Sequence, residues 1–347
     1  MRAAWPIVSL LALVSAIALI LPGVSAGLSG AVVAALINLI LVVGLYVFVG
    51  NSGVLSFGHV TFMAVGAYVC AILTIPTIAR AIMIPNVPSF VPKTAIATIP
   101  AILAGALLAG VLGVIVGVPI VRLTGLSAGL AMFAVLLAAN VVFSNWSPGP
   151  GGAGILTRVP TDLTVAGTLM WALLAMILAY LFQRSRWGLR LRGSRDDEHA
   201  ARSLGVNVTA QRLQAMVLSA FITGIGGALY GHYVGSFGPD AFYIPTTFLV
   251  LAMLVVGGID SLAGAVVGTL VISVISYALN QWTNDLPVGP ITLKLPAGSS
   301  QLVVALLMLG ILIVRPAGLM RGRETALPRL LAGAPRSKTR SGPVRAR

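Results

Sequence analysis

Residues 28–50 read LSGAVVAALINLILVVGLYVFVG, an apolar run without a single charged side chain. A helix needs about 20 such residues to cross the roughly 30 Å hydrocarbon core of a bilayer, so this run is long enough to span a membrane. The composition of the whole chain agrees, because 58% of its residues are hydrophobic and only 9% are charged. Soluble domains carry about 25% charged residues. We therefore predict a membrane protein.

The same length criterion predicts an all-α, polytopic integral membrane protein with about ten transmembrane helices in a domain covering residues 1–320. Residues 321–347 then form a basic cytoplasmic tail, which we expect to be disordered on the inner leaflet. The eighth span is short and ends at Gly257-Gly258, so a tight, re-entrant hairpin with the ninth is an open alternative. The predicted spans are 5–22, 28–50, 59–79, 94–121, 125–145, 163–183, 213–234, 245–258, 261–280 and 299–314.

The basic residues predict the orientation of these spans. Seven of the 22 lie between Arg184 and Arg212, and nine more lie between Arg315 and Arg347. The positive-inside rule places both clusters in the cytoplasm, and an inside N-terminus puts them on the same side without adjustment. This distribution favours a topology signal and contact with anionic membrane lipid, and it argues against a nucleic-acid partner despite the net charge of +14. The external loops are then 80–93, 146–162, 235–244 and 281–298.

The N-terminal segment allows two interpretations. Arg2, the apolar stretch 7–21 and the small residues Val24-Ser25-Ala26 together resemble a cleavable signal peptide. We favour an uncleaved membrane helix. Cleavage would leave the topology of the remaining spans unchanged.

The chain lacks the chemistry of an enzyme. Ser56 and His59 are three residues apart, but no carboxylate lies near them in sequence to orient the imidazole. The single cysteine, Cys70, excludes a disulfide framework and a cysteine metal cluster, and the three histidines are scattered. We predict no catalytic residue, no cofactor and no metal site. A membrane enzyme or a structural scaffold remains as a rival hypothesis.

The chain also lacks a means of energising transport. A phosphate-binding Walker loop needs Gly-Lys-Ser/Thr, whereas Lys93, Lys294 and Lys338 follow Pro, Leu and Ser. No carboxylate lies in mid-span to couple a proton or sodium ion, although broken helices can bind Na⁺ without one. The energy must therefore come from another subunit or, as a rival hypothesis, from the ion gradient of a secondary carrier.

The loop 184–212 is the most specific feature. It contains the string Glu198-x-Ala200-Ala201-x-x-x-Gly205, in which acidic residues begin a short helix and the glycine can end it. This string resembles the "EAA" loop of ABC importer permeases. The resemblance implies a short cytoplasmic coupling helix that sits in a cleft of an ATPase subunit. The residues that it assigns to this contact are Asp197, Glu198, Ala200, Ala201 and Gly205.

Four further segments, in order along the chain, are similar to branched-chain amino acid ABC permeases of the M type. They include the stretch from Ser52 to Phe62, which reads SGVLSFGHVTF, and the glycine-rich stretch 256–264. The others are 219–230 and 314–319. Glycines in the first stretch interrupt a helical run, which predicts a broken or re-entrant element facing the pathway. The residues that we assign to the translocation pathway are Ser52, Gly53, Ser56, Phe57, Gly58 and His59.

The resemblance implies a permease subunit of an ATP-driven importer in the bacterial cytoplasmic (inner) membrane. Its expected substrate is a branched-chain or similar hydrophobic amino acid, with urea or a short amide as the alternative, because closely similar permeases serve those solutes. Its expected partners are a second homologous permease, two ABC ATPase subunits and an extracytoplasmic solute-binding protein. Gly44-Leu45-Tyr46 and Pro150-Gly151-Gly152 depart from the family pattern on the translocation side, so they bear on the substrate more than on the mechanism.

Overall fold

A computed structural model describes residues 5–23, 26–83, 94–146, 154–284, 287–288, 291–292 and 318–320, with isolated residues between 303 and 313. These residues are almost entirely helical, apart from one short antiparallel hairpin and an isolated bridge between Leu156 and Phe237. The elements are α1 (Trp5–Ile20), η1 (Leu21–Gly23), α2 (Ala26–Ser52), α3 (Val60–Thr74), α4 (Thr77–Met83), α5 (Thr98–Ile120), α6 (Gly125–Asn145), α7 (Val165–Arg184), α8 (Arg186–Asp196), α9 (Glu198–Ser203), α10 (Val208–Val234), η2 (Pro239–Phe242), α11 (Ile244–Gly257), α12 (Leu262–Asn284), β1 (Pro287–Val288) and β2 (Ile291–Thr292).

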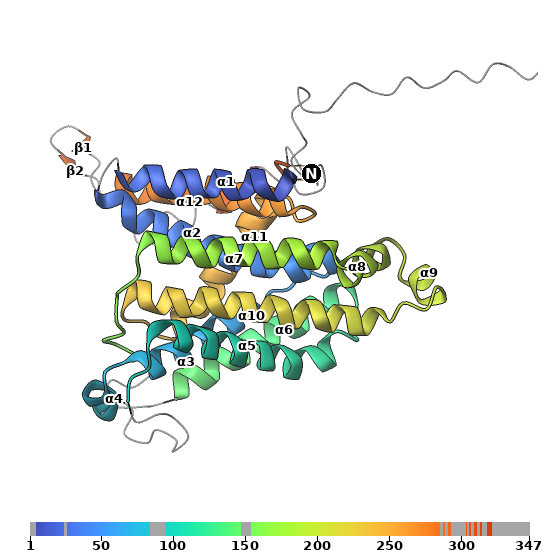
Figure 1. Cartoon of the computed structure of the whole chain (residues 1–347), viewed down its shortest axis with the longest axis horizontal. Coiled ribbons are helices and arrows are strands. Elements are labelled where there is room, and N and C mark those ends of the chain that lie inside the picture. Colours follow the sequence, from blue (N-terminus) through green and yellow to red (C-terminus); the bar gives the residue numbers. More distant parts are fainter. Residues whose placement is uncertain are drawn as a thin grey trace, which may run out of the picture.

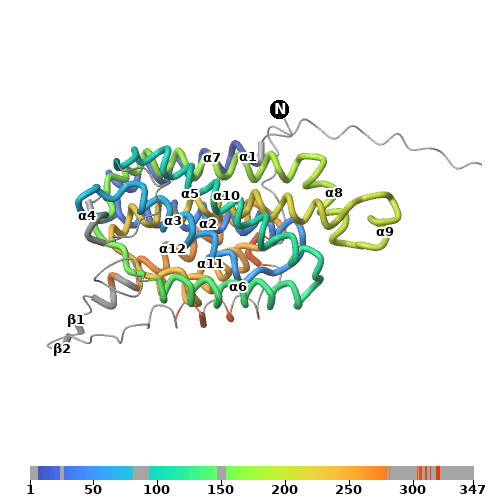
Figure 2. The backbone as a smooth tube through the Cα atoms, turned by 90° about the horizontal axis from the view of Figure 1, so that it is seen from below, coloured from blue at the N-terminus to red at the C-terminus, as the bar shows by residue number. Residues whose placement is uncertain are grey.

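The long helices lie side by side along one axis (Figure 1). Helix α10 is the central one and packs against α2, α3 and α5. Helices α8 and α9 project from one end of the bundle, which we call the arm end, and we call α8 and α9 together the arm. Helix α4 and the β1–β2 hairpin lie at the opposite end, which we call the loop end (Figures 1 and 2).

Small residues allow the central helices to approach closely, as in other membrane helix pairs. A Cβ atom on Gly113 would lie 2.7 Å from the Cβ of Ala220, and one on Gly117 would lie 2.8 Å from Leu213. These contacts join α5 to α10. The two helices are antiparallel, because the later glycine of α5 meets the earlier residue of α10. Gly227 contacts the backbone of Met63 in the same way and joins α10 to α3. These glycines therefore bring α5 and α3 close to α10.

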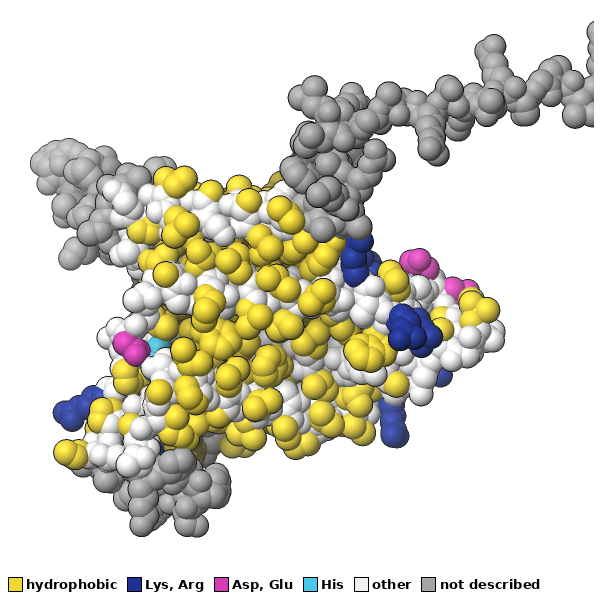
Figure 3. All heavy atoms as spheres, viewed as in Figure 1, with side chains coloured by type: hydrophobic (Ala, Val, Ile, Leu, Met, Phe, Trp, Pro, Cys, Tyr) yellow, Lys and Arg dark blue, Asp and Glu magenta, His cyan; other side chains and the backbone are white. Residues whose placement is uncertain are grey.

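The outside of the bundle is apolar over its middle. Figure 3 shows hydrophobic side chains over the central part of one face, with charged side chains confined to the two ends. Seven helices among the described residues are long and apolar enough to cross a membrane, and Ile7–Gly23 and Val60–Thr74 are shorter apolar helices. The prediction of an all-α, polytopic membrane protein is confirmed.

Two predicted boundaries differ from the structure, and the structure bears on the hairpin after the eighth span. The span predicted at 59–79 is divided into α3, which ends at Thr74, and α4, because Pro76 keeps the preceding residue out of the helical conformation. The loop predicted at 80–93 therefore begins inside α4. Helix α11 follows η2 at the loop end and is followed by Asp260, which pairs with Arg195 of the arm, so the α11–α12 hairpin crosses the bundle. The tail 321–347 and most of the span 299–314 lie outside the described residues.

Aromatic rings close the loop end beneath the segment 154–162. The Tyr68 ring stacks on Phe143 with centroids 4.4 Å apart, and it meets Phe237 edge to face. The Tyr68 hydroxyl donates a hydrogen bond to the Gly154 carbonyl at 2.7 Å. Phe242 of η2 packs against the same rings. These contacts join α3, α6, η2 and the segment that follows α10 at this end.

Candidate functional site

The arm is built from two short helices with side-chain caps. Ser185 separates α7 from α8, and its hydroxyl accepts a hydrogen bond from the backbone N–H of Gly188. Asp197 separates α8 from α9, and its carboxylate accepts one from the N–H of Ala200 at 2.9 Å. Such caps satisfy N–H groups that have no partner in the first turn of a helix. Asp196 is the last residue of α8.

Gly205 ends α9 as the sequence predicted. Its φ angle is +79°, which is the left-handed region that glycine adopts without strain. The Gly205 N–H bonds to the Arg202 carbonyl and the Val206 N–H bonds to the Ala201 carbonyl, which together form a Schellman motif. Asn207 then caps α10 by accepting from the N–H of Ala210. The caps at both ends of α9 are therefore formed by residues that are close to it in sequence.

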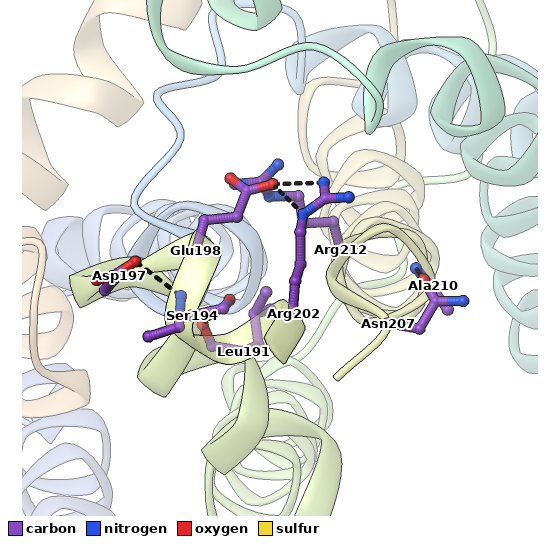
Figure 4. A network of polar contacts seen from close by, with 9 residues as sticks. Leu191, Ser194, Asp197, Glu198, Arg202, Asn207, Ala210 and Arg212 are labelled. Carbon is purple, nitrogen blue, oxygen red and sulfur yellow. Dashed lines mark hydrogen bonds and ion pairs between the residues drawn. The ribbon is translucent and has the colours of Figure 1, made fainter. Parts of the chain in front are cut away.

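Glu198 points back toward the bundle (Figure 4). One carboxylate oxygen lies 2.6 Å from a guanidinium nitrogen of Arg202, and the other lies 2.8 Å from one of Arg212 at the start of α10. The Arg212 side chain is only 7% exposed. The hydrogen bond from Arg202 and the charge of Arg212 lower the pKa of Glu198. Glu198 thus joins the arm to α10.

The outer face of the arm is formed by other side chains. Leu204, which follows α9, is 85% exposed, although it is a large apolar residue at the polar end of the molecule. Ala200 and Gly205 are exposed beside it, whereas Ala201 is only 8% exposed and faces inward. Leu204 was not among the residues predicted from the sequence to make this contact. A leucine inside a charged loop was the available signal.

The interrupted segment after α2 is re-entrant. Residues 53–58 are not helical, and α3 begins only at Val60, after His59. His59 contacts Ser219, which lies about 16 Å along α10 from Val208 at 1.5 Å per residue. Six extended residues reach about 20 Å, which covers this depth. The chain therefore runs from the arm end to the middle of the bundle in a non-helical conformation, and we call residues 53–58 the re-entrant segment.

Burial alternates from one residue to the next along the re-entrant segment. Val54, Ser56 and Gly58 are buried in the bundle. Leu55 is 43% exposed, and Gly53 and Phe57 also retain exposure on the same side. Of the residues assigned to the pathway, only Gly53 and Phe57 therefore lie on the open face. The other four, Ser52, Ser56, Gly58 and His59, are buried behind it.

His59 joins the re-entrant segment to two helices. Ser219 donates its hydroxyl hydrogen to the Gly44 carbonyl at 2.6 Å, so the same oxygen accepts from Nε2 of His59 at 2.7 Å. Nδ1 of His59 lies 2.6 Å from the hydroxyl oxygen of Ser56. The Phe48 ring stacks on the imidazole. His59 is thus an internal brace, with all its polar atoms engaged.

This arrangement does not resemble a catalytic centre. A Ser–His pair needs a third group that orients the imidazole, usually a carboxylate. The second nitrogen of His59 instead faces the hydroxyl of Ser219. Within the described residues, no three His, Cys, Asp or Glu side chains are grouped so that they could hold a metal ion.

Known proteins provide independent comparisons. A family model described as "Branched-chain amino acid transport system / permease component" matches residues 27–312, which include the arm and the re-entrant segment. The fructose import permease protein FrcC of Rhizobium meliloti is 29% identical over 177 residues, covering 44% of this chain and 49% of the relative. The branched-chain amino acid permease protein LivM of Salmonella typhimurium is 30% identical over 164 residues, covering 46% and 35%.

A third relative is the nucleoside ABC transporter permease protein NupC of Lactococcus lactis, which is 28% identical over 137 residues, covering 37% of this chain and 43% of the relative. This chain spans about half the length, or less, of these curated relatives. No solved structure matches it. The relatives are transport components rather than enzymes, and they carry different solutes. Because the family model covers most of the chain, from α2 to beyond α12, this protein belongs to the branched-chain amino acid transport system permease family of multi-pass inner-membrane proteins.

Proposed function

We propose that this chain is a permease subunit of an ATP-driven importer and that its arm docks on an ATPase subunit. The observation that supports this most strongly is the arm itself. Two capped helices hold Leu204 beyond the end of the bundle, where it is 85% exposed. Removing a large apolar side chain from water is favourable, so a partner that covers Leu204 gains binding free energy. The complete transporter would contain a second homologous permease, two ATPases and an extracytoplasmic solute-binding protein.

The charges support a cytoplasmic position for the arm end. This end carries Arg122 and the seven arginines between 184 and 212, whereas Arg80 and Arg158 lie toward the loop end. Under the positive-inside rule, the arm end faces the cytoplasm, where ATP is available. The loop end then faces the solute-binding protein.

The open face of the re-entrant segment supports a hydrophobic amino acid as substrate. Leu55 and Phe57 offer apolar surface, and the non-helical backbone around them offers N–H and C=O groups. An amino acid such as leucine needs both, because its side chain is apolar and its ends are charged. The LivM relative is named for branched-chain amino acid transport. A sugar or nucleoside would require several polar side chains on this face.

Reconstitution tests the substrate. The chain is placed in proteoliposomes with its companion permease, ATPases and binding protein, and uptake of labelled leucine, urea and fructose is measured. We expect ATP-dependent leucine uptake, with no uptake driven by a sodium or proton gradient alone. Preferred uptake of urea or fructose would overturn the substrate. Uptake by this chain alone, driven by an ion gradient, would overturn the importer mechanism.

Leu204→Asp is expected to weaken ATPase binding at least tenfold. Burying a leucine contributes about 1.5–3 kcal/mol, and a tenfold change in affinity corresponds to about 1.4 kcal/mol. Copurification and titration of the ATPase measure the effect. Leu123→Asp is the matched control, because Leu123 is 38% exposed at the same end but lies in the α5–α6 turn. Unchanged ATPase affinity in Leu204→Asp would contradict docking through this residue.

A further inference from the structure

Two arginines of α8 face the bundle. Arg192 and Arg195 are three residues apart and therefore lie on the same side of the helix. Arg192 Nε donates to the Asn51 side-chain oxygen at 2.8 Å, and Arg192 Nη2 donates to the Tyr46 hydroxyl. Both partners are fully buried near the end of α2. Arg192 therefore fixes the arm to α2.

Arg195 reaches three other parts of the chain. Its Nη1 lies 2.6 Å from a carboxylate oxygen of Asp260, in the turn between α11 and α12, and donates to the Gly50 carbonyl at 3.3 Å. Its aliphatic stem lies on Gly53, because a Cβ on Gly53 would be 2.8 Å from Arg195 Cγ. One side chain thus links the arm with the end of α2, the first residue of the re-entrant segment and the α11–α12 turn.

The two arginines differ in how easily their contacts can break. The Arg195 and Asp260 side chains are 32% and 47% exposed. Ion pairs with that exposure add little net stability, because water and salt screen them and their ordering costs entropy. Arg192 instead donates to two oxygens that are buried from water, and its loss would remove the donor that the Asn51 side-chain oxygen has. The first contact can therefore open and close, while the second stays.

We propose that Arg195 is a positioning residue of the transport cycle. Its contacts with Asp260 and Gly50 hold the re-entrant segment and the α11–α12 turn together while the arm lies against the bundle. Movement of the arm, pivoting at Arg192, breaks these contacts and releases the segment. This inference rests on the proposed function, since an ATPase must move the arm. Arg195 acts through the segment and does not contact the substrate.

A charge exchange tests the contact in the complete reconstituted transporter. We expect Arg195→Glu and Asp260→Arg each to lower leucine uptake per ATP hydrolysed about fivefold or more, which is typical of coupling between two sites. The double variant should reach at least half of the wild-type leucine uptake per ATP hydrolysed, because opposite charges face each other again. Arg190→Glu on the exposed side of α8 is the matched control and should keep the ratio. Unchanged ratios in both single variants, or no recovery in the double variant, would overturn the proposal.

A distance measurement tests the movement with the ion pair intact. The variant Gly193→Cys/Ile259→Cys carries a spin label on each new cysteine, and Cys70→Ala removes the native thiol. The distance between the two labels is measured in the complex without nucleotide and with trapped ATP. Gly193 has open space around it, and Ile259 precedes Asp260. We expect the distance distribution to shift with ATP. An identical distance distribution in both states would overturn the proposed movement of the arm, whatever the substrate is. A shifted distribution without leucine uptake would count only against the proposed substrate.

Discussion

Replacing Glu198 with arginine is expected to abolish ATP-driven uptake while the helical bundle stays folded. The wild-type carboxylate joins Arg202 of the arm to Arg212 of α10. Without it, the Arg212 guanidinium, 7% exposed, has lost its partner and faces a second positive charge. Leaving a buried polar group unsatisfied costs about 1–3 kcal/mol, and more for a charged one. Helix α9 has only six residues and cannot remain helical without such contacts.

Limited proteolysis measures this result directly. Cleavage within 197–206 should become rapid in Glu198→Arg, with ATPase copurification lost and the protease resistance of the bundle retained. Asp196→Arg is the matched control, because it makes the same charge change on the neighbouring exposed carboxylate. Combining Glu198→Gln with Arg212→Gln should restore much of the protection, since no buried charge then lacks a partner. A protected, transporting Glu198→Arg variant would refute this role of Glu198.

The pH dependence of the arm provides a further check on Glu198. Its pKa is lowered in the folded protein, chiefly by the hydrogen bond from Arg202 and the charge of Arg212. A carboxyl group of this kind stabilises the fold above its ordinary pKa, and that contribution is lost as pH falls through the lowered value. The arm should therefore resist proteolysis at neutral and mildly acidic pH and lose protection only in stronger acid. Glu198→Gln should lack this transition.

The membrane helices could be predicted from the sequence because one physical requirement determines them. A span must be apolar over about 20 residues, and residues 28–50 meet this requirement without any knowledge of their neighbours. The helix ends were also predictable wherever their chemistry is local. Gly205 ends α9 and Asn207 begins α10, and in both cases the deciding hydrogen bonds involve residues within a few positions.

The candidate site was less predictable because its contacts join distant residues. The glycines predicted an interruption near Gly53 and Gly58, but not which side chains would face outward. That depends on the brace between His59 and Ser219, which are 160 positions apart. Likewise, the acidic character of Glu198 was evident, but its direction depends on Arg212. The family resemblance is confirmed at the level of the permease family, while the substrate and the residue roles remain predictions.

Introducing even a methyl group at Gly58 is expected to reduce transport, and a larger side chain there is expected to abolish it. A Cβ on Gly58 would collide with the backbone carbonyl of Met132 in α6 and lie 3.1 Å from its side-chain methyl carbon. Backbone atoms cannot rotate away, so α6 must move off the re-entrant segment. Overpacking of this kind costs about 1–3 kcal/mol. Replacing an unstrained glycine with alanine recovers only about 0.4–1 kcal/mol through the unfolded chain, so the collision dominates.

Thermal unfolding and uptake measured together distinguish a local change from general misfolding. Gly58→Ala should lower the unfolding temperature and reduce uptake, Gly58→Val should abolish uptake, and both should still bind the ATPase, because the arm contacts neither α6 nor Gly58 in any described interaction. Gly193→Ala is the matched control, since a Cβ there has open space around it. Wild-type uptake in Gly58→Val would show that α6 does not need its close approach to the re-entrant segment. The open face of Leu55 and Phe57 would then lose its structural basis as the pathway.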